Sequence, residues 1–83
     1  MELNGVEVSD PVRQAQERVR EGDIYDYHHE YEKAIISYDN ALQIDPDCAD
    51  AWFNKAITLN KIKRHSEATR CVAIALNLYV GKN

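Results

Sequence analysis

Two adjacent histidines and a glutamate, His28, His29 and Glu30, have side chains of the types that bind transition metals. A helical metal site needs two ligands about four residues apart, because that spacing places both side chains on one face. Adjacent histidines at a helix end point in different directions, and the sequence has no second histidine at a spacing of four. We therefore interpret these residues as a solvated turn and expect no metal and no other cofactor.

The two cysteines, Cys48 and Cys71, are too few and too far apart in the sequence for a zinc knuckle or a redox pair. Cys71 lies beside Val72 at a helical position, which favours a small packed side chain. Cys48 lies in a turn, where we expect it to be exposed. We expect no disulfide between them, because thiols stay reduced in the compartment that we predict below.

The sequence carries no catalytic constellation. No serine or cysteine is matched with a base, no glycine-rich loop is present that could hold a phosphate, and no pair of carboxylates is placed in a cleft. We therefore predict that the protein is not an enzyme and has no catalytic residue.

The length and composition are those of one small domain. The chain has 83 residues, of which 45% are apolar, with few glycines and prolines. It has no apolar run near the roughly 20 residues that a membrane span needs. Its N-terminus lacks the basic and then apolar segment of a secretion signal. We predict a cytoplasmic protein that does not bind membranes.

The charge is divided unevenly along the chain. Residues 1–50 carry 13 acidic and 4 basic side chains, whereas residues 51–83 carry 1 acidic and 6 basic ones. This division is either chance clustering on a solvated surface or complementarity, between two copies of the chain or between each half and a partner. The net charge of −4 disfavours nucleic-acid binding, for which the only support is a small basic corner at Lys61, Lys63, Arg64 and Arg70.

A regular repeat organises the sequence. When the chain is shifted by 34, small residues align with small ones and large apolar residues with large apolar ones. The aligned pairs are Ala15 and Ala49, Gly22 and Ala56, Tyr25 and Leu59, Ala34 and Ala68, Tyr38 and Val72, Ala41 and Ala75, Leu42 and Leu76, and Ile44 and Leu78. The small residues allow close packing of antiparallel helices, and the larger ones, including Tyr25 and Tyr38, are expected to fill the space between them. Pro46 separates the two units.

This period and these residue types resemble the tetratricopeptide repeat family from about Ala15 to the end of the chain. The resemblance implies an all-α fold of two tandem helix-turn-helix repeats, a right-handed α-solenoid fragment of four helices. We predict a flexible tail at residues 1–10, repeats at 11–46 and 47–81, and a tail at 82–83. The four helices are expected at about 11–27, 31–44, 49–62 and 66–79, with Ser66 as the cap of the last and Gly81 as its end.

The sequence departs from the family pattern at several positions. The family's tryptophan and leucine of the first helix are replaced in the first unit by Arg18 and Glu21, and the leucine of the second unit by Lys55. The polarity of Arg18 and Glu21 leads us to expect that no repeat precedes the first unit.

The resemblance implies that side chains of the first helices line a concave groove that receives a peptide. The groove positions are Gln16, Val19, Arg20, Asp23, Asp26, Tyr27, Asp50, Phe53, Asn54, Ile57, Asn60 and Lys61. They form an apolar strip at Val19, Phe53 and Ile57 with acids around it. The alternative is that these are ordinary surface residues of a small scaffold, or that they serve in self-association.

Some family members grip the C-terminal carboxylate of chaperones with lysine, asparagine and arginine at set groove positions. Asn54 fits one of these positions, but the others read Val19, Asp23 and Asp50, of which the two acids would repel a carboxylate. We therefore expect a basic or apolar peptide or protein segment as the partner, rather than an acidic chaperone tail.

The last helix is apolar almost all round, which indicates that something covers more than one of its faces. We predict self-association through Ile74, Leu78 and Tyr79, with a two-fold antiparallel dimer as the favoured homo-oligomer. An alternative remains open: a purely structural assembly unit, or a fragment of a longer repeat array, with no separate ligand.

Overall fold

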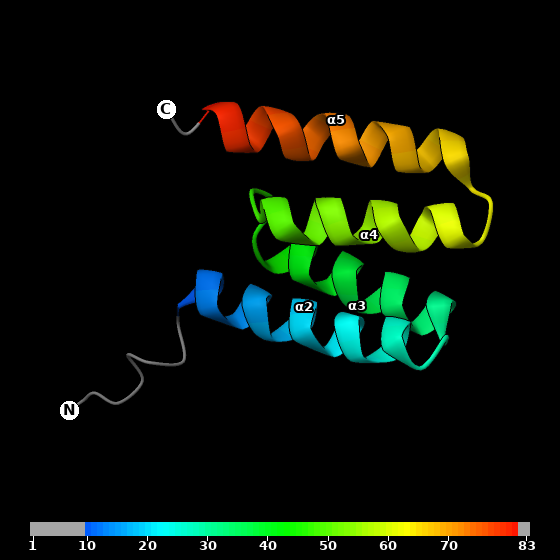
Figure 1. Cartoon of the computed structure of the whole chain (residues 1–83). Coiled ribbons are helices and arrows are strands. Elements are labelled where there is room, and N and C mark those ends of the chain that lie inside the picture. The colour runs from blue at the N-terminus through cyan, green and yellow to red at the C-terminus, as the bar shows by residue number, and fades with distance from the viewer. Residues whose placement is uncertain (1–9, 82–83) are drawn as a thin grey trace.

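The computed structural model describes residues 10–81, which form four α-helices and no strand. The helices are α2 (Pro11–Tyr27), α3 (Tyr31–Ile44), α4 (Ala49–Lys61) and α5 (His65–Gly81), and each runs antiparallel to the helix before it (Figure 1). The all-α prediction of four helices in two hairpins is confirmed. Of the predicted tails at 1–10 and 82–83, residues 1–9 and 82–83 lie outside the described residues.

Helix α2 begins with a side-chain cap at Asp10. The Asp10 carboxylate accepts hydrogen bonds from the backbone N–H groups of Val12 at 3.1 Å and Arg13 at 3.3 Å. Pro11 follows as the first helical residue, where its missing N–H costs nothing. The prediction of Ser66 as the cap of the last helix is wrong, because α5 already begins at His65 and Ser66 lies inside its first turn.

The turns within the two repeats have the same backbone geometry at equivalent positions. His29 and Lys63 both have positive φ angles, of 64° and 68°. In each turn the next N–H group reaches back to the preceding helix, from Glu30 to the Tyr25 carbonyl and from Arg64 to the Leu59 carbonyl, both at 2.9 Å. A residue in this left-handed conformation ends the helix, because it turns the following N–H group back toward the last carbonyls of the helix.

The core of the first repeat is built around Tyr38. Its side chain is almost fully buried, and its ring lies against Gly22 of α2 so closely that an added Cβ there would meet ring atoms at 2.5 Å. The buried residues of this cluster are Ala15, Val19, Ala34, Tyr38, Ala41, Cys48 and Ala51. The alanines and the glycine therefore allow the close helix approach that the period predicted.

The expected burial of Cys48 and of Tyr25 is wrong. Cys48 is buried rather than exposed, because the turn between the repeats packs its thiol into the first cluster, where Gln16 Nε2 lies 3.7 Å from Cys48 Sγ. Burial raises the pKa of the Cys48 thiol.

Tyr25 is exposed at the edge of α2, whereas Leu59 at the same position of the second repeat is fully buried. The difference arises because α3 packs beside Leu59, and no helix of residues 10–81 packs in that way beside Tyr25.

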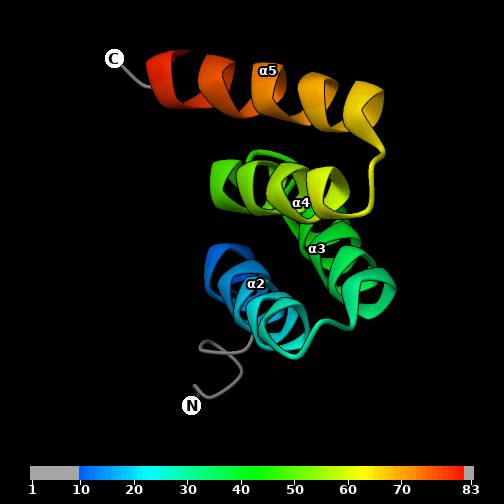
Figure 2. The same ribbon diagram turned by 45° about the vertical axis from the view of Figure 1, so that its right-hand side comes forward.

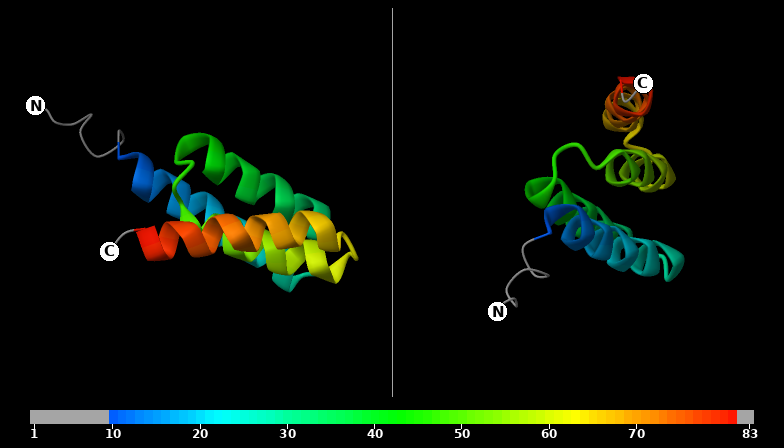
Figure 3. Two further views of the ribbon diagram at one scale, coloured as in Figure 1. Left: turned by 90° about the horizontal axis from the view of Figure 1, so that it is seen from above. Right: turned by 90° about the vertical axis from the view of Figure 1, so that its left-hand side faces the viewer.

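The helices form one continuous stack. Helix α2 packs on α3, α3 also on α4, and α4 on α5, while α2 and α4 contact one another on the same side of the stack (Figure 2). A second cluster, made by Ile35, Ala56, Leu59, Ala68 and Cys71, joins α3 to the second repeat. Helix α5 lies along α4 at one edge of the stack (Figure 3).

Candidate protein-interaction groove

Two hollows lie on the side of the molecule that α2 and α4 share. The first is at the C-terminal ends of these helices and is lined by Asp23, Asp26, Tyr27, His29 and Lys61. Lys61 is distant in sequence from the other four, since the whole of α3 separates the two helices. The repeat register, however, predicts that α2 and α4 share this surface.

Asp26 joins the two repeats at the first hollow. Its Oδ1 accepts a hydrogen bond from the hydroxyl of the fully buried Thr58 at 2.8 Å, and its Oδ2 forms an ion pair with Lys61 Nζ at 2.6 Å. The hydrogen bond with Asp26 raises the pKa of Lys61. The carboxylate is therefore engaged on both oxygens by α4.

Asp23, one turn earlier on α2, makes a second junction. Its Oδ1 accepts from the Tyr38 hydroxyl at 2.6 Å and from Asn54 Nδ2 at 3.1 Å. Burial, and then the hydrogen bond to Asp23, raise the pKa of Tyr38 well above its ordinary value. Asn54, the position that fits the carboxylate clamp, thus points at an acid of its own chain.

The second hollow lies at the opposite end of the same side. Its lining comes from the start of α2, the turn between the repeats, the start of α4 and the end of α5. The residues are Val12, Gln16, Asp45, Asp47, Cys48, Ala49, Asp50 and Tyr79, and we call this surface the acidic hollow. Three carboxylates and no basic side chain line it.

The carboxylates of the acidic hollow differ in their partners. The Tyr79 hydroxyl donates to Asp50 Oδ1, which ties the end of α5 to the start of α4. This hydrogen bond is the main reason that the pKa of Tyr79 is raised to about 12. Asp45 Oδ1 accepts from the backbone N–H of Asp47 at 3.1 Å. Among the described residues the Asp47 carboxylate has no hydrogen bond or ion pair.

Val19 does not belong to the groove surface, which corrects the predicted apolar strip. It is only 4% exposed and packs in the first cluster. Phe53, at the same position of the second repeat, is 40% exposed. Helix α4 packs against α2 and covers Val19, whereas no helix within residues 10–81 covers α4 in that way.

The remaining predicted groove residues are at or near the surface. Arg20, Tyr27, Asp50, Ile57, Asn60 and Lys61 are exposed, and Gln16 and Asn54 are half-buried. Asn60 Oδ1 lies 2.7 Å from His65 Nδ1. Sequence reasoning missed Thr58 and assigned Tyr79 to self-association alone. Thr58 carries the one hydroxyl among the buried positions of α4, which is a signal that a buried acceptor is near.

The histidines of the first turn have protein partners. His29 Nδ1 lies 2.6 Å from the Tyr31 hydroxyl, and the ring of His28 packs edge-on against Tyr27. Within residues 10–81 no group of three or more histidine, cysteine, aspartate or glutamate side chains is arranged to hold a metal ion.

Comparison with known proteins decides the family. Residues 22–62, from the middle of α2 to the turn after α4, match the family model described as "TPR repeat". Residues 22–62 therefore belong to the tetratricopeptide repeat family. Its members are generally non-catalytic scaffolds that bind proteins or peptides, and this membership indicates a protein–protein interaction module.

One curated relative is an uncharacterized protein of Methanocaldococcus jannaschii, which is 42% identical over 40 residues. The match covers 48% of this chain and 46% of the relative, so the chain spans about half the length of that protein. None of the helices described between residues 10 and 81 has the length and apolar character that crossing a membrane requires.

Proposed function

We propose that this tetratricopeptide repeat chain binds a protein or peptide segment of basic and apolar character along the α2–α4 side, in the cytoplasm. The observation that carries the proposal is the acidic hollow, which has three carboxylates and no lining cation. A lysine or arginine of the partner would supply the missing charge.

An exposed track on α4 continues from this hollow. Asp50, Phe53 and Ile57 follow one another at spacings of three and four, so their side chains share one face of the helix. Phe53 and Ile57 are both exposed. A segment with a basic residue at the acidic hollow would therefore place apolar residues against this track.

The first hollow contributes little to charge selection. Its lining includes a cation, Lys61, which forms an ion pair with Asp26 at 2.6 Å, whereas the lining of the acidic hollow has none. The acidic selectivity that we propose therefore comes from the end of the groove with Asp45, Asp47 and Asp50. These acids also disfavour an acidic tail with a free carboxylate.

A fluorescence-anisotropy titration tests this function. The probes are a labelled peptide of alternating basic and apolar residues and an acidic peptide that ends in a free carboxylate. We expect tighter binding of the basic peptide and weaker binding to Phe53→Ala. The matched control is Leu76→Ala, which also truncates an exposed apolar side chain but lies on α5 and lines neither hollow. Tighter binding of the acidic peptide, or equal loss in both variants, would refute the proposal.

A second candidate function is structural self-assembly. Helix α5 exposes four large apolar side chains, Ile74, Leu76, Tyr79 and Val80. We propose that a second copy of the chain contacts α5. Ile74→Asp and Leu78→Asp are expected to weaken this assembly, whereas Phe53→Ala is expected to leave it intact. Sedimentation velocity measures the assembly independently of peptide binding.

A further inference from the structure

The first repeat packs on the second through α3. The surfaces equivalent to the two sides of this internal interface are exposed at the two ends of the helix stack. Internally, α3 packs against the second repeat. Ile35 of α3 shares a buried cluster with Leu59 of α4 and Cys71 of α5. Asp39 Oδ1 of α3 forms an ion pair with Lys55 Nζ of α4 at 2.6 Å.

Helix α5 presents the equivalent of the α3 half. A shift by one repeat period moves Ile35, Asp39 and Leu42 onto Thr69, Ala73 and Leu76. With Val80 these residues are spaced by four, three and four, so they share one side of α5, which we call the Leu76 flank. All four are exposed, and Leu76 and Val80 are 54% and 67% exposed. Leu42, by contrast, is half-buried against the first cluster.

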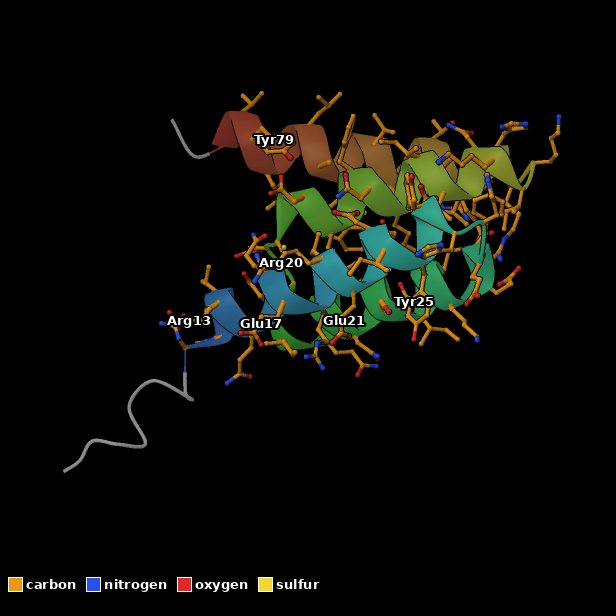
Figure 4. The ribbon with its side chains drawn as sticks, turned by 60° about the horizontal axis from the view of Figure 1, so that its bottom comes forward. Arg13, Glu17, Arg20, Glu21, Tyr25 and Tyr79 are labelled. Atoms are coloured by element: carbon orange, nitrogen blue, oxygen red, sulfur yellow. The ribbon has the colours of Figure 1, made fainter. Side chains whose placement is uncertain are left out.

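Helices α2 and α3 present the equivalent of the other half. The same shift moves Lys55, Ala56 and Leu59 back onto Glu21, Gly22 and Tyr25. A hollow between the two helices is lined by Glu21, Tyr25, Lys33, Ile36, Ser37 and Asn40, and we call it the Tyr25 hollow. Ile36 is 60% exposed there. Glu21 and Tyr25 lie side by side on the outer side of α2, at the end of the stack opposite to α5 (Figures 1 and 4).

We propose that the chain associates head to tail, with the Leu76 flank of one copy docked in the Tyr25 hollow of the next. This proposal rests on the self-association proposed above, and it places the contact on the Leu76 flank instead of on Ile74 and Leu78, which lie on another side of α5. It replaces the two-fold dimer expected from the sequence, because pairing of two α5 helices covers one exposed end and leaves the Tyr25 hollow open. Head-to-tail contact covers both ends with a packing that this sequence already forms.

Charge favours the same order of repeats. Within residues 10–81, the three ion pairs across the internal junction each join a base of the second repeat to an acid of the first: Lys55 to Asp39, Lys61 to Asp26 and Arg64 to Glu32. In the head-to-tail arrangement the basic second repeat of one copy again meets the acidic first repeat of another. Complementary units attract over several ångströms before contact.

The contact between copies is expected to be weaker than the internal one. The Asp39–Lys55 ion pair is replaced by Ala73 opposite Glu21, and Trp52 is replaced by Arg18, which pairs with Glu21 at 3.3 Å. A head-to-tail contact also does not close on itself, so the assembly has no fixed size. The average mass should therefore keep rising with protein concentration.

Two variants of the full chain, each blocked at one end, test the geometry. Leu76→Asp places a charge on the Leu76 flank, and Ile36→Asp places one in the Tyr25 hollow, both at exposed positions. Circular dichroism of each variant first establishes that the helices are retained. Alone, each variant is expected to be about tenfold weaker in association than the unmodified chain. Mixed, they are expected to form a one-to-one dimer, because each still has one open end.

Sedimentation velocity of the variants and their mixture distinguishes the outcomes. A mixture that gains a dimer absent from both separate samples supports the proposal. If Ile36→Asp alone still dimerises and the mixture gains nothing, the two-fold arrangement holds and the head-to-tail geometry is overturned while self-association stands. A monomeric unmodified chain up to millimolar concentration would overturn self-association itself, and the peptide titration of the groove would remain an independent result.

Discussion

Gly22 of α2 and Tyr38 of α3 lie in such close contact that the glycine has no room for a side chain. An ideal Cβ on Gly22 would lie 2.5 Å from Tyr38 Cε1 and 2.8 Å from Cδ1. Because Tyr38 is buried and its hydroxyl is held by Asp23, its ring cannot rotate away without breaking that bond. The glycine therefore sets how closely the two helices of the first repeat approach.

Gly22→Ala is expected to destabilise the fold. Alanine favours a helix over glycine by about 1 kcal/mol, but overpacking a core costs about 1–3 kcal/mol, and the rigid ring makes the overlap the larger effect. Urea denaturation followed by circular dichroism measures the change. Gly81→Ala is the control, since a Cβ there meets no atom within 4 Å. Equal stability of Gly22→Ala and the unmodified chain would show that Tyr38 can move.

Asp26→Ala is expected to lower the free energy of unfolding by about 1–3 kcal/mol, because the buried Thr58 hydroxyl loses its acceptor. Lys61, which is exposed, contributes much less to this loss. The control is Glu17→Ala, an exposed acid on the same helix. Chemical denaturation that gives the same loss for both variants would contradict a role of Asp26 in joining the repeats.

Tyr79→Phe is expected to remove one ionisation step near pH 12 from the tyrosine titration of the protein. The hydrogen bond to Asp50 raises the pKa of Tyr79 from 10.0 to about 12, because it favours the protonated phenol. The stability that depends on this group is therefore fully present below pH 10 and is lost as the pH rises through the pKa of the folded chain. A difference titration of tyrosinate absorbance between the two proteins measures it. A step centred at 10 would show that the contact with Asp50 does not form.

Asp47→Asn is expected to weaken binding of the basic peptide, by about 0.2–1 kcal/mol for an exposed charge pair. Asp47 suits this test because its carboxylate has no partner in the described residues, so the substitution breaks no internal side-chain bond. Added salt should reduce the difference between the two proteins. Glu17→Gln serves as the control, since Glu17 does not line the acidic hollow. Anisotropy titrations with an equal effect of both substitutions would indicate general charge attraction only.

Ala73→Asp is expected to weaken head-to-tail association, because it places a carboxylate opposite Glu21 of the next copy. Adding Glu21→Lys should restore or strengthen association, since the pair then matches Asp39 and Lys55 of the internal junction. Both positions are exposed, so the fold should tolerate both changes. Sedimentation velocity of the single and double variants measures the coupling. If the effects of the two substitutions on association simply add, Ala73 and Glu21 do not lie opposite one another in the assembly.

The helices and their ends were predictable because they depend on local chemistry. The repeat period and the order and approximate bounds of the four helices agree with the structure. Ser66 misled because a short oxygen side chain favours a helix cap, while the backbone turn at Lys63 let α5 start one residue earlier. The groove positions follow from the register, and their use by a partner stays a prediction.

The sequence by itself determined the number and order of the helices and where small residues let them approach, since these follow from neighbours within one or two turns. Only the tertiary structure decided which equivalent positions are covered: Val19 is buried and Phe53 exposed, although they occupy the same position in the two repeats. It also decided that Asp23 and Asp26 bond to α3 and α4 rather than remain open to a partner. The physical reason is that burial and pairing depend on the helix that packs across from a residue, and the residue's own segment carries no information about that helix.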